Sequence, residues 1–145
     1  MKIALIQTNP IVGDFAYNCN QIIHASKKAI AEGCSLAIFP EMAVSGYPPQ
    51  DLLERTAFVN QQNMAVTDLI KKLPSLDVLF GCFEQRKGQN GKKLYNSGVV
   101  ARNGEIVFRA HKQLLPSYDV FDETRYFEPG GTPAIYSVKG ISFGV

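Results

Sequence analysis

The chain has 145 residues, which fits one domain or part of one. Hydrophobic residues make up 46% and charged residues 19%, a composition that is typical of a globular protein and excludes a disordered one. The net charge is +2, and the basic residues form no cluster with interleaved aromatic side chains, which argues against a nucleic-acid-binding protein.

The first forty residues predict a βαβ unit. Residues 2–8 are apolar on both faces, as in a strand of a sheet that is covered on both sides. Residues 16–31 carry a helical apolar stripe, and Gly33 ends that helix. Residues 35–39 form a second strand, which we expect to run parallel to the first after a right-handed crossover.

The rest of the chain predicts one long helix and five further strands. Asn103-Gly104 between two apolar runs is the strongest hairpin signal of the sequence. Residues 111–131 are long, irregular and rich in large apolar side chains, which favours a functional loop. The elements expected after Pro40 are a helical turn from residue 50, a helix at 57–73, a polar surface loop at 86–93, and strands at 77–83, 94–101, 106–110, 132–138 and 141–145.

No segment of the sequence is typical of a membrane span or a signal peptide. The apolar runs are shorter than the roughly 18 residues that a transmembrane helix needs. The apolar run at the N-terminus is too short for a signal peptide. We therefore expect a cytoplasmic protein without a membrane partner.

The cysteines and histidines do not form a metal-binding or disulfide pattern. Cys19, Cys34 and Cys82 are an odd number without paired spacing, and His24 and His111 lie far apart. A zinc site or a disulfide framework is therefore not expected, and no metal is assigned. Each cysteine lies in or beside a predicted helix or strand, so we interpret all three as small buried hydrophobic residues.

Two charged residues stand where predicted strands end. Glu41 follows the strand at 35–39, and Lys112 follows the strand at 106–110. In an open α/β sheet, such positions collect ligands and catalytic groups. A carboxylate beside an ammonium can act as a general base while the cation stabilises an oxyanion. From spacing alone, an ordinary salt bridge is the alternative.

Residues 39–41 (Phe-Pro-Glu), 45–47 (Ser-Gly-Tyr) and 111–116 (His-Lys-Gln-Leu-Leu-Pro) together resemble the nitrilase (carbon–nitrogen hydrolase) superfamily. Two longer runs, 46–53 and 112–127, resemble more specifically the glutaminase domain of glutamine-dependent NAD⁺ synthetases. The similarity extends over the whole chain. It implies an α/β fold, the N-terminal portion of a nitrilase-type α-β-β-α sandwich with a mixed sheet flanked by helices.

Residue by residue, the resemblance implies a Glu-Lys-Cys triad. Glu41 would be the general base towards the cysteine thiol, and Lys112 would stabilise the tetrahedral intermediate on the glutamine amide. Glu123 matches a second glutamate that supports the triad. Tyr47 and Tyr118 match tyrosines that line the glutamine pocket, and a half-buried packing role is an alternative for each of them.

The nucleophilic cysteine of that triad is absent from this chain. In the family it belongs to a Cys-Glu-Asp motif at the end of the strand that residues 141–145 begin, and none of the three cysteines present can replace it. We therefore expect residues 1–145 to be a partial glutamine amidohydrolase domain, truncated just before the end of the nucleophile strand and inactive alone. The synthetase domain is also missing, and no role follows for His111.

The resemblance implies that the parent protein hydrolyses glutamine to supply ammonia for the amidation of deamido-NAD⁺. The domain described here would need no cofactor, whereas the missing synthetase domain would use ATP and Mg²⁺ with deamido-NAD⁺. The expected partners are glutamine and the synthetase domain of the same chain, within a homo-oligomer. Two alternatives stay open: another nitrilase-type amidase or N-carbamoyl hydrolase, and a non-catalytic interaction half-domain.

Overall fold

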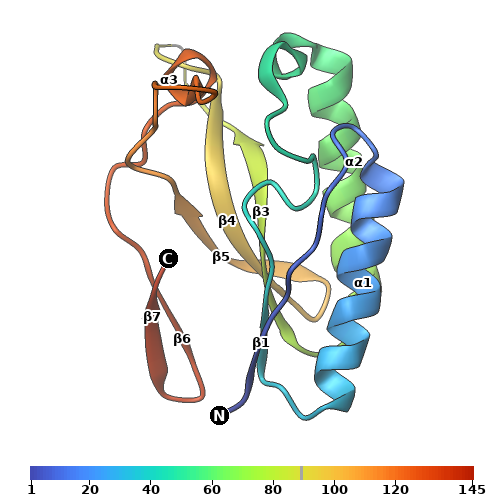
Figure 1. Ribbon diagram of the computed structural model, residues 1–145. Helices are drawn as coiled ribbons and strands as arrows, with labels where there is room; N and C mark the ends of the chain where they lie inside the picture. Colours follow the sequence, from blue (N-terminus) through green and yellow to red (C-terminus); the bar gives the residue numbers. More distant parts are fainter. Residues whose placement is uncertain (89) are drawn as a thin grey trace.

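The computed structural model describes residues 1–88 and 90–145. Its centre is a five-stranded mixed sheet in the order β1-β2-β3-β4-β5 (Figure 1). The first three strands are parallel, and β4 and β5 are added antiparallel, which confirms the predicted α/β class with a mixed sheet. The strands are β1 (Ile3–Leu5), β2 (Leu36–Ile38), β3 (Asp77–Gln85), β4 (Leu94–Arg102) and β5 (Glu105–His111).

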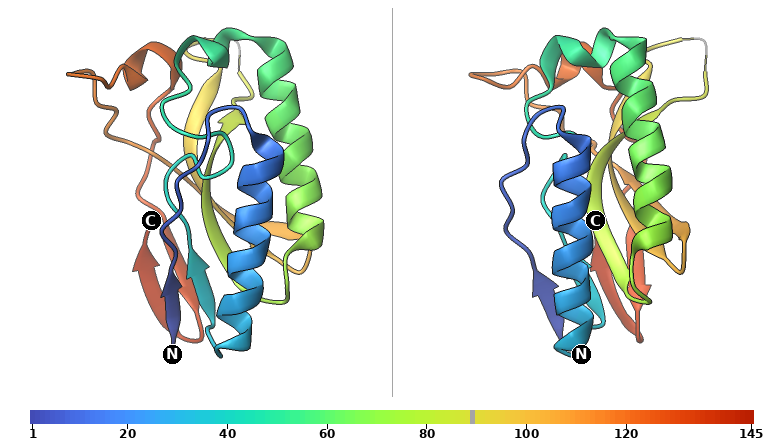
Figure 2. Two further views of the ribbon diagram at one scale, coloured as in Figure 1. Left: turned by 45° about the vertical axis from the view of Figure 1, so that its right-hand side comes forward. Right: turned by 90° about the vertical axis from the view of Figure 1, so that its right-hand side faces the viewer.

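Two long helices, α1 (Phe15–Ala31) and α2 (Thr56–Lys72), lie side by side and cover one face of the sheet (Figure 2). The side chain of Asp14 caps α1 by accepting a hydrogen bond from the backbone N of Tyr17 at 3.0 Å. Gly33 follows the helix with a φ of 77°, a conformation that glycine adopts without strain. Both helices begin and end within two residues of the predicted ranges, which were 16–31 and 57–73.

The main hydrophobic core lies between the sheet and these two helices. Ile22 and Leu69 extend from the helices and pack with residues of β3 and β4, among them Val78, Phe80 and Val99. All five side chains are at most 1% exposed. β3 and β4 are buried on both faces over most of their length, which explains the apolar runs at residues 78–83 and 99–101.

A separate antiparallel hairpin, β6 (Ile135–Val138) and β7 (Ile141–Gly144), covers part of the opposite face of the sheet (Figure 1). Tyr136 donates a hydrogen bond of 2.7 Å from its hydroxyl to Oδ2 of the buried Asp77 on β3. The apolar contact under the hairpin includes Leu36, Val100, Tyr136 and Val138. The predicted last two strands thus pair with each other and form a sheet of their own.

The turn between β4 and β5 confirms the predicted hairpin. Asn103 and Gly104 have φ values of 52° and 82°, the left-handed conformations that a two-residue hairpin loop requires. The β4–β5 register shifts between Val100 and Ala101, where a bulge increases the local twist.

The remaining differences from the sequence-based expectations concern the length of β1 and the short helices between the main elements. β1 covers three residues instead of residues 2–8, because it pairs only with the equally short β2. The irregular segment 111–131 contains one short helix, α3 (Glu123–Tyr126), and the predicted turn after Pro49 is the 3-10 helix η1 (Gln50–Glu54). Gln89, in the predicted loop at 86–93, lies outside the described residues. No helix of the described part of the chain is long and apolar enough to cross a membrane.

Candidate active site

The loop that carries Glu41 is held directly against β3. The backbone N of Gly81 donates to the carbonyl of Pro40 at 3.2 Å, and the backbone N of Val44 donates to the carbonyl of Gly81 at 3.3 Å. A Cβ atom at position 81 would lie 2.4 Å from the backbone N of Met42 and 2.7 Å from the Cα of Glu41. Only a glycine at this position lets the loop approach β3 so closely.

Lys112 is placed by the end of β5. Its backbone N donates to the carbonyl of Asn96 at 2.8 Å, and its carbonyl accepts from the backbone N of Gly130 at 2.9 Å. Its Nζ atom lies 3.0 Å from Oε1 of Glu41 and 3.0 Å from Oε1 of Glu123. The two strand-end residues singled out in the sequence therefore meet, and they do so as an ion pair shared with a third residue.

Glu123, the first residue of α3, is a buried carboxylate with several donors. Its side chain is 4% exposed. Besides Lys112 Nζ, it accepts hydrogen bonds from the Tyr47 hydroxyl at 2.8 Å and from Asn96 Nδ2 at 3.3 Å. A buried charge is costly unless it is paired and hydrogen-bonded, and these donors meet that requirement.

Asn96 is the site residue that the sequence-based prediction missed. It lies on β4 and is 3% exposed. Its Nδ2 atom donates to Oε1 of Glu41 at 2.5 Å and to Oε2 of Glu123 at 3.3 Å. Two polar residues in the middle of the predicted strand 94–101, Asn96 and Ser97, were the available signal, because buried polar side chains nearly always have a partner.

The charges of the cluster favour an ammonium at Lys112. Burial lowers the pKa of Lys112, but the hydrogen bonds and negative charges of Glu123 and Glu41 together raise that pKa above its ordinary value. The pKa of Tyr47 is also raised, first by burial and then by the hydrogen bond and charge of Glu123. Lys112 is therefore protonated and Tyr47 neutral at physiological pH.

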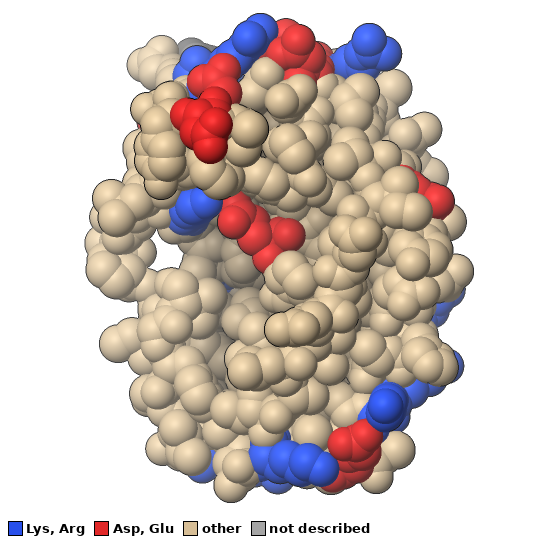
Figure 3. Space-filling model, in the orientation of Figure 1, with Lys and Arg blue, Asp and Glu red and all other residues tan. Residues whose placement is uncertain are grey.

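Glu41 and Lys112 line a hollow of about 470 Å³ that also includes Asn96, Leu114 and Val145. Figure 3 shows acidic and basic side chains meeting at the rim of the hollow on this face of the molecule. Apolar side chains form most of the remaining wall: Phe39, Leu79, Phe80 and Ala110. The arrangement presents a carboxylate and an ammonium to a partly apolar space.

The two predicted pocket tyrosines occupy different positions. The Tyr47 hydroxyl belongs to the charged cluster through Glu123. Tyr118 is 71% exposed and lines an adjoining hollow of about 590 Å³ together with Lys112 and Thr124. Its ring contacts Phe121 edge-on at 5.7 Å between the ring centroids. The structure thus brings Tyr47 to the cluster and leaves Tyr118 beside it.

His111 lies next to the cluster in the sequence but has its own contacts. Its Nδ1 atom lies 2.8 Å from the hydroxyl of Ser97, and its ring stacks on Tyr95 with 4.1 Å between the centroids. The Nδ1 atom is 3.9 Å from Oε2 of Glu84. These contacts hold the ring of His111 in place, and His111 also lines the hollow that Glu41 and Lys112 share.

All three cysteines are buried in the main core, as predicted. Cys82 on β3 is 1% exposed, and burial raises its pKa well above the ordinary value. Burial also raises the pKa of Cys19 to about 11. Cys34 is 8% exposed and belongs to the same apolar cluster. A buried thiol with a raised pKa is a poor nucleophile.

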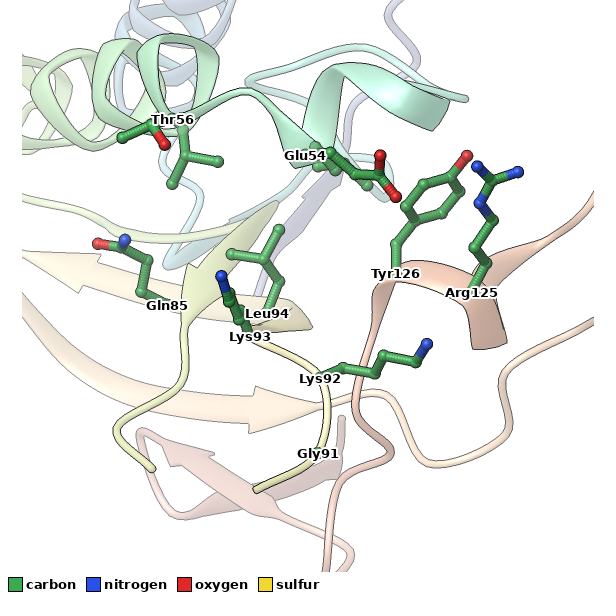
Figure 4. Close-up of a pocket in the computed structure, with 11 residues that line it drawn as sticks. Glu54, Thr56, Gln85, Gly91, Lys92, Lys93, Leu94, Arg125 and Tyr126 are labelled. Atoms are coloured by element: carbon green, nitrogen blue, oxygen red, sulfur yellow. The ribbon is translucent and has the colours of Figure 1, made fainter. Parts of the chain in front are cut away.

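A second hollow of about 470 Å³ lies between η1, the start of β4 and α3 (Figure 4). Its walls include Glu54, Lys92 and Arg125, and Arg125 forms an ion pair of 3.2 Å with Asp51. None of the five predicted site residues lines this hollow. Within residues 1–88 and 90–145, no group of three or more His, Cys, Asp or Glu side chains is arranged to hold a metal ion.

Comparison with known proteins identifies the relatives of the chain. The sequence model of the carbon-nitrogen hydrolase family matches residues 2–145. The chain is 42% identical to a glutamine-dependent NAD(+) synthetase of Synechocystis over 99% of its length and 26% of that protein, and 34% identical to the Thermotoga maritima synthetase, of which it covers 25%. The solved structure of the Acinetobacter baumannii synthetase with ADP superposes with a TM-score of 0.89 and 33% identity, over 98% of this chain and 26% of that one. The chain thus spans about a quarter of the length of these relatives.

Proposed function

The chain belongs to the carbon-nitrogen hydrolase family, and on this basis we propose that it is part of the glutaminase unit of a glutamine-dependent NAD⁺ synthetase. In this role the site hydrolyses the side-chain amide of glutamine and supplies ammonia for the amidation of deamido-NAD⁺. The observation that carries the proposal is the position of Lys112 Nζ, 3.0 Å from both Glu41 and Glu123 at the rim of the hollow. The names of the relatives support glutamine as the substrate.

Lys112 has one N–H group left for the substrate. An ammonium has three donors, and two of them are used by Glu41 and Glu123. The third can donate to the oxyanion that forms when the amide carbon is attacked. A fixed donor of this kind typically contributes about 100- to 1000-fold to the rate. The raised pKa keeps the lysine protonated while it does so.

Glu41 has one oxygen available for proton transfer. Oε1 accepts hydrogen bonds from Lys112 and Asn96, whereas Oε2 has no hydrogen-bond partner among the residues that the structure describes. Oε2 takes the proton of a cysteine thiol, the thiolate attacks the amide carbon, and the same proton then passes to the leaving nitrogen as the C–N bond breaks. Water then attacks the glutamyl thioester while Glu41 takes a proton from that water, and Glu41 returns this proton to the sulfur as the C–S bond breaks and glutamate forms.

The thiol for this reaction comes from outside residues 1–145. Cys19, Cys34 and Cys82 all lie in the main core, where they pack against helices and strands. We propose that the nucleophile enters the hollow that Glu41 and Lys112 share, next to Val145. The 145-residue chain alone should therefore release no ammonia from glutamine.

The lengths and names of the relatives support the proposal for the parent protein. The parent protein would carry a synthetase domain that binds ATP and Mg²⁺ with deamido-NAD⁺ and that receives the ammonia from this site. It would form a homo-oligomer in the cytoplasm. The glutaminase unit itself would use no cofactor, because a carboxylate, an ammonium and a thiol suffice for the hydrolysis.

The test is made on the protein encoded by the complete reading frame that contains these residues. Glu41→Gln removes the proton acceptor and should lower glutamine-dependent NAD⁺ formation by about 100- to 10,000-fold. Added ammonium salt bypasses the site and should restore NAD⁺ formation. The matched control is Glu105→Gln at the exposed first residue of β5, which should leave both rates unchanged.

Two results would contradict the proposal. One is a Glu41→Gln protein that still forms NAD⁺ from glutamine within about tenfold of the unmodified rate, because a general base contributes more than that. The other is release of glutamate and ammonia from glutamine by the 145-residue chain alone.

A further inference from the structure

We propose that Asn96 is a positioning residue for the base of this reaction. Its side-chain amide holds the carboxylates of Glu41 and Glu123 in one arrangement, so that Oε2 of Glu41 is the oxygen left to exchange the proton. The inference rests on the proposed function, because it assigns a proton-transfer role to Glu41.

The backbone of Asn96 is fixed on both sides. β4 is the fourth strand of the five-stranded sheet, and Asn96 lies opposite Phe83 on β3. On the other side, its carbonyl accepts the hydrogen bond from the backbone N of Lys112 at 2.8 Å. The backbones of Asn96 on β4 and of Lys112, directly after β5, are thus joined by a hydrogen bond.

The Asn96 amide links two segments that are far apart in the sequence. Glu41 belongs to the loop after β2, and Glu123 begins α3, within the long irregular segment. An amide NH₂ group has two N–H donors, one for each carboxylate. The group is neutral and keeps its protons at every pH, so it brings the two negative charges together without adding a charge of its own.

Both donors to Glu41 use the same oxygen. Lys112 Nζ and Asn96 Nδ2 donate to Oε1, while the side chain of Glu41 as a whole is 44% exposed. With Lys112 as the only donor, this exposed carboxylate could turn about a single hydrogen bond and carry Oε2 away from the hollow. A misplacement of about 1 Å in a catalytic group costs on the order of 100-fold in rate.

The first experiment separates turnover from substrate binding in the complete protein. Asn96→Asp and Asn96→Leu keep the shape of the side chain and remove the amide donor. Both should lower kcat for glutamine hydrolysis by about 100-fold, with a change in KM of less than about threefold. The matched control is Asn63→Asp on α2, where the asparagine amide donates to Gln85 at 3.0 Å, and it should leave kcat unchanged.

The inference is overturned if kcat of both Asn96 variants stays within about threefold of the unmodified value, or if the loss lies in KM alone. If the unmodified protein does not hydrolyse glutamine, the proposed function is contradicted instead. The second experiment then decides whether Asn96 positions Glu41.

The second experiment observes Asn96 itself and does not depend on turnover. In the complete protein labelled with ¹⁵N-asparagine, the side-chain amide of Asn96 should exchange with water more slowly than that of Asn63, because it is buried between two carboxylates. Its resonances should move in Glu41→Gln and in Glu123→Gln. Exchange as fast as that of Asn63, or resonances that ignore both substitutions, would overturn the inference even where an Asn96 variant fails to fold.

Discussion

Gly81 determines how closely the Glu41 loop approaches the sheet. The contacts of 2.4 Å and 2.7 Å that a Cβ would make there are with backbone atoms, which cannot rotate away as a side chain can. We expect Gly81→Ala to push Glu41 out of reach of Lys112 and to reduce the free energy of unfolding by about 1–3 kcal/mol. Urea unfolding of the variant measures the change in unfolding free energy. The displacement of Glu41 is measured by the rate of glutamine hydrolysis in the complete protein, which should fall by about 100-fold.

Gly131→Ala is the control for this substitution. A Cβ at position 131 meets no atom within 4 Å, and the backbone there is not left-handed. Its unfolding free energy and activity should equal those of the unmodified protein. If Gly81→Ala behaved like this control, the loop could move without harm, and the close approach would have no role in positioning Glu41.

At the scale of single residues, the sequence predicted Glu41, Lys112, Glu123 and Tyr47 of the cluster but not Asn96. Glu41 and Lys112 are recognisable because each follows a predicted strand, and the structure places Lys112 Nζ 3.0 Å from Oε1 of Glu41. Glu123 and Tyr47 could be singled out only through resemblance to a family, since nothing local marks them. Asn96 was not predicted, because a polar residue within a strand does not show which distant side chains it will contact.

The β6–β7 hairpin is attached to the sheet by apolar contacts and by one buried hydrogen bond, from Tyr136 to Asp77. Tyr136→Phe removes the donor and leaves the buried carboxylate with its contact to Arg102 at 3.6 Å. We expect the free energy of unfolding to fall by about 1–2 kcal/mol at pH 7. Tyr17→Phe on the exposed side of α1 is the control and should change it little.

The same hydrogen bond predicts a pH dependence. Burial, followed by the hydrogen bond and charge of Asp77, raises the pKa of Tyr136 to about 12. The ordinary tyrosine pKa is about 10, so the contribution of Tyr136 to stability is complete below about pH 10 and is lost as the pH rises towards 12. The difference in unfolding free energy between the unmodified protein and Tyr136→Phe should therefore shrink over this range in urea titrations. A difference that stayed constant up to pH 12 would contradict the assignment.

The types of the main elements were predictable, and their pairing and lengths were less so. The stripe of α1 and the Asn103-Gly104 turn are local patterns that determine structure over a few residues. The length of β1 depends on its partner β2, which lies more than thirty residues away in the chain. The isolation of β6 and β7 from the large sheet depends on the other face of that sheet, which no local pattern describes.

Stability should be unevenly distributed over the whole molecule. β3 and β4 are buried on both faces and are hydrogen-bonded on both sides, whereas the β6–β7 hairpin pairs only with itself. Regions with few buried contacts open locally at a lower free energy than the central strands. We therefore expect the paired amides of β3 and β4 to exchange with deuterium at least tenfold more slowly than those of the hairpin, as measured by mass spectrometry.

Equal exchange rates in the hairpin and the central strands would contradict this expectation, and would mean that the molecule opens only as a whole. The Tyr136→Phe variant gives a further comparison. It should accelerate exchange in the hairpin and leave the central strands unchanged, because the lost hydrogen bond lies between the two sheets.

The burial of all three cysteines makes thiol labelling a way to count catalytic centres. Cys19, Cys34 and Cys82 are at most 8% exposed, so an alkylating reagent should react with them far more slowly than with an accessible thiol while the protein is folded. In the complete protein, rapid labelling then reports only thiols that lie outside residues 1–145. The decrease in the number of labels per subunit when glutamine is bound first would then count the working sites in a preparation without any measurement of turnover.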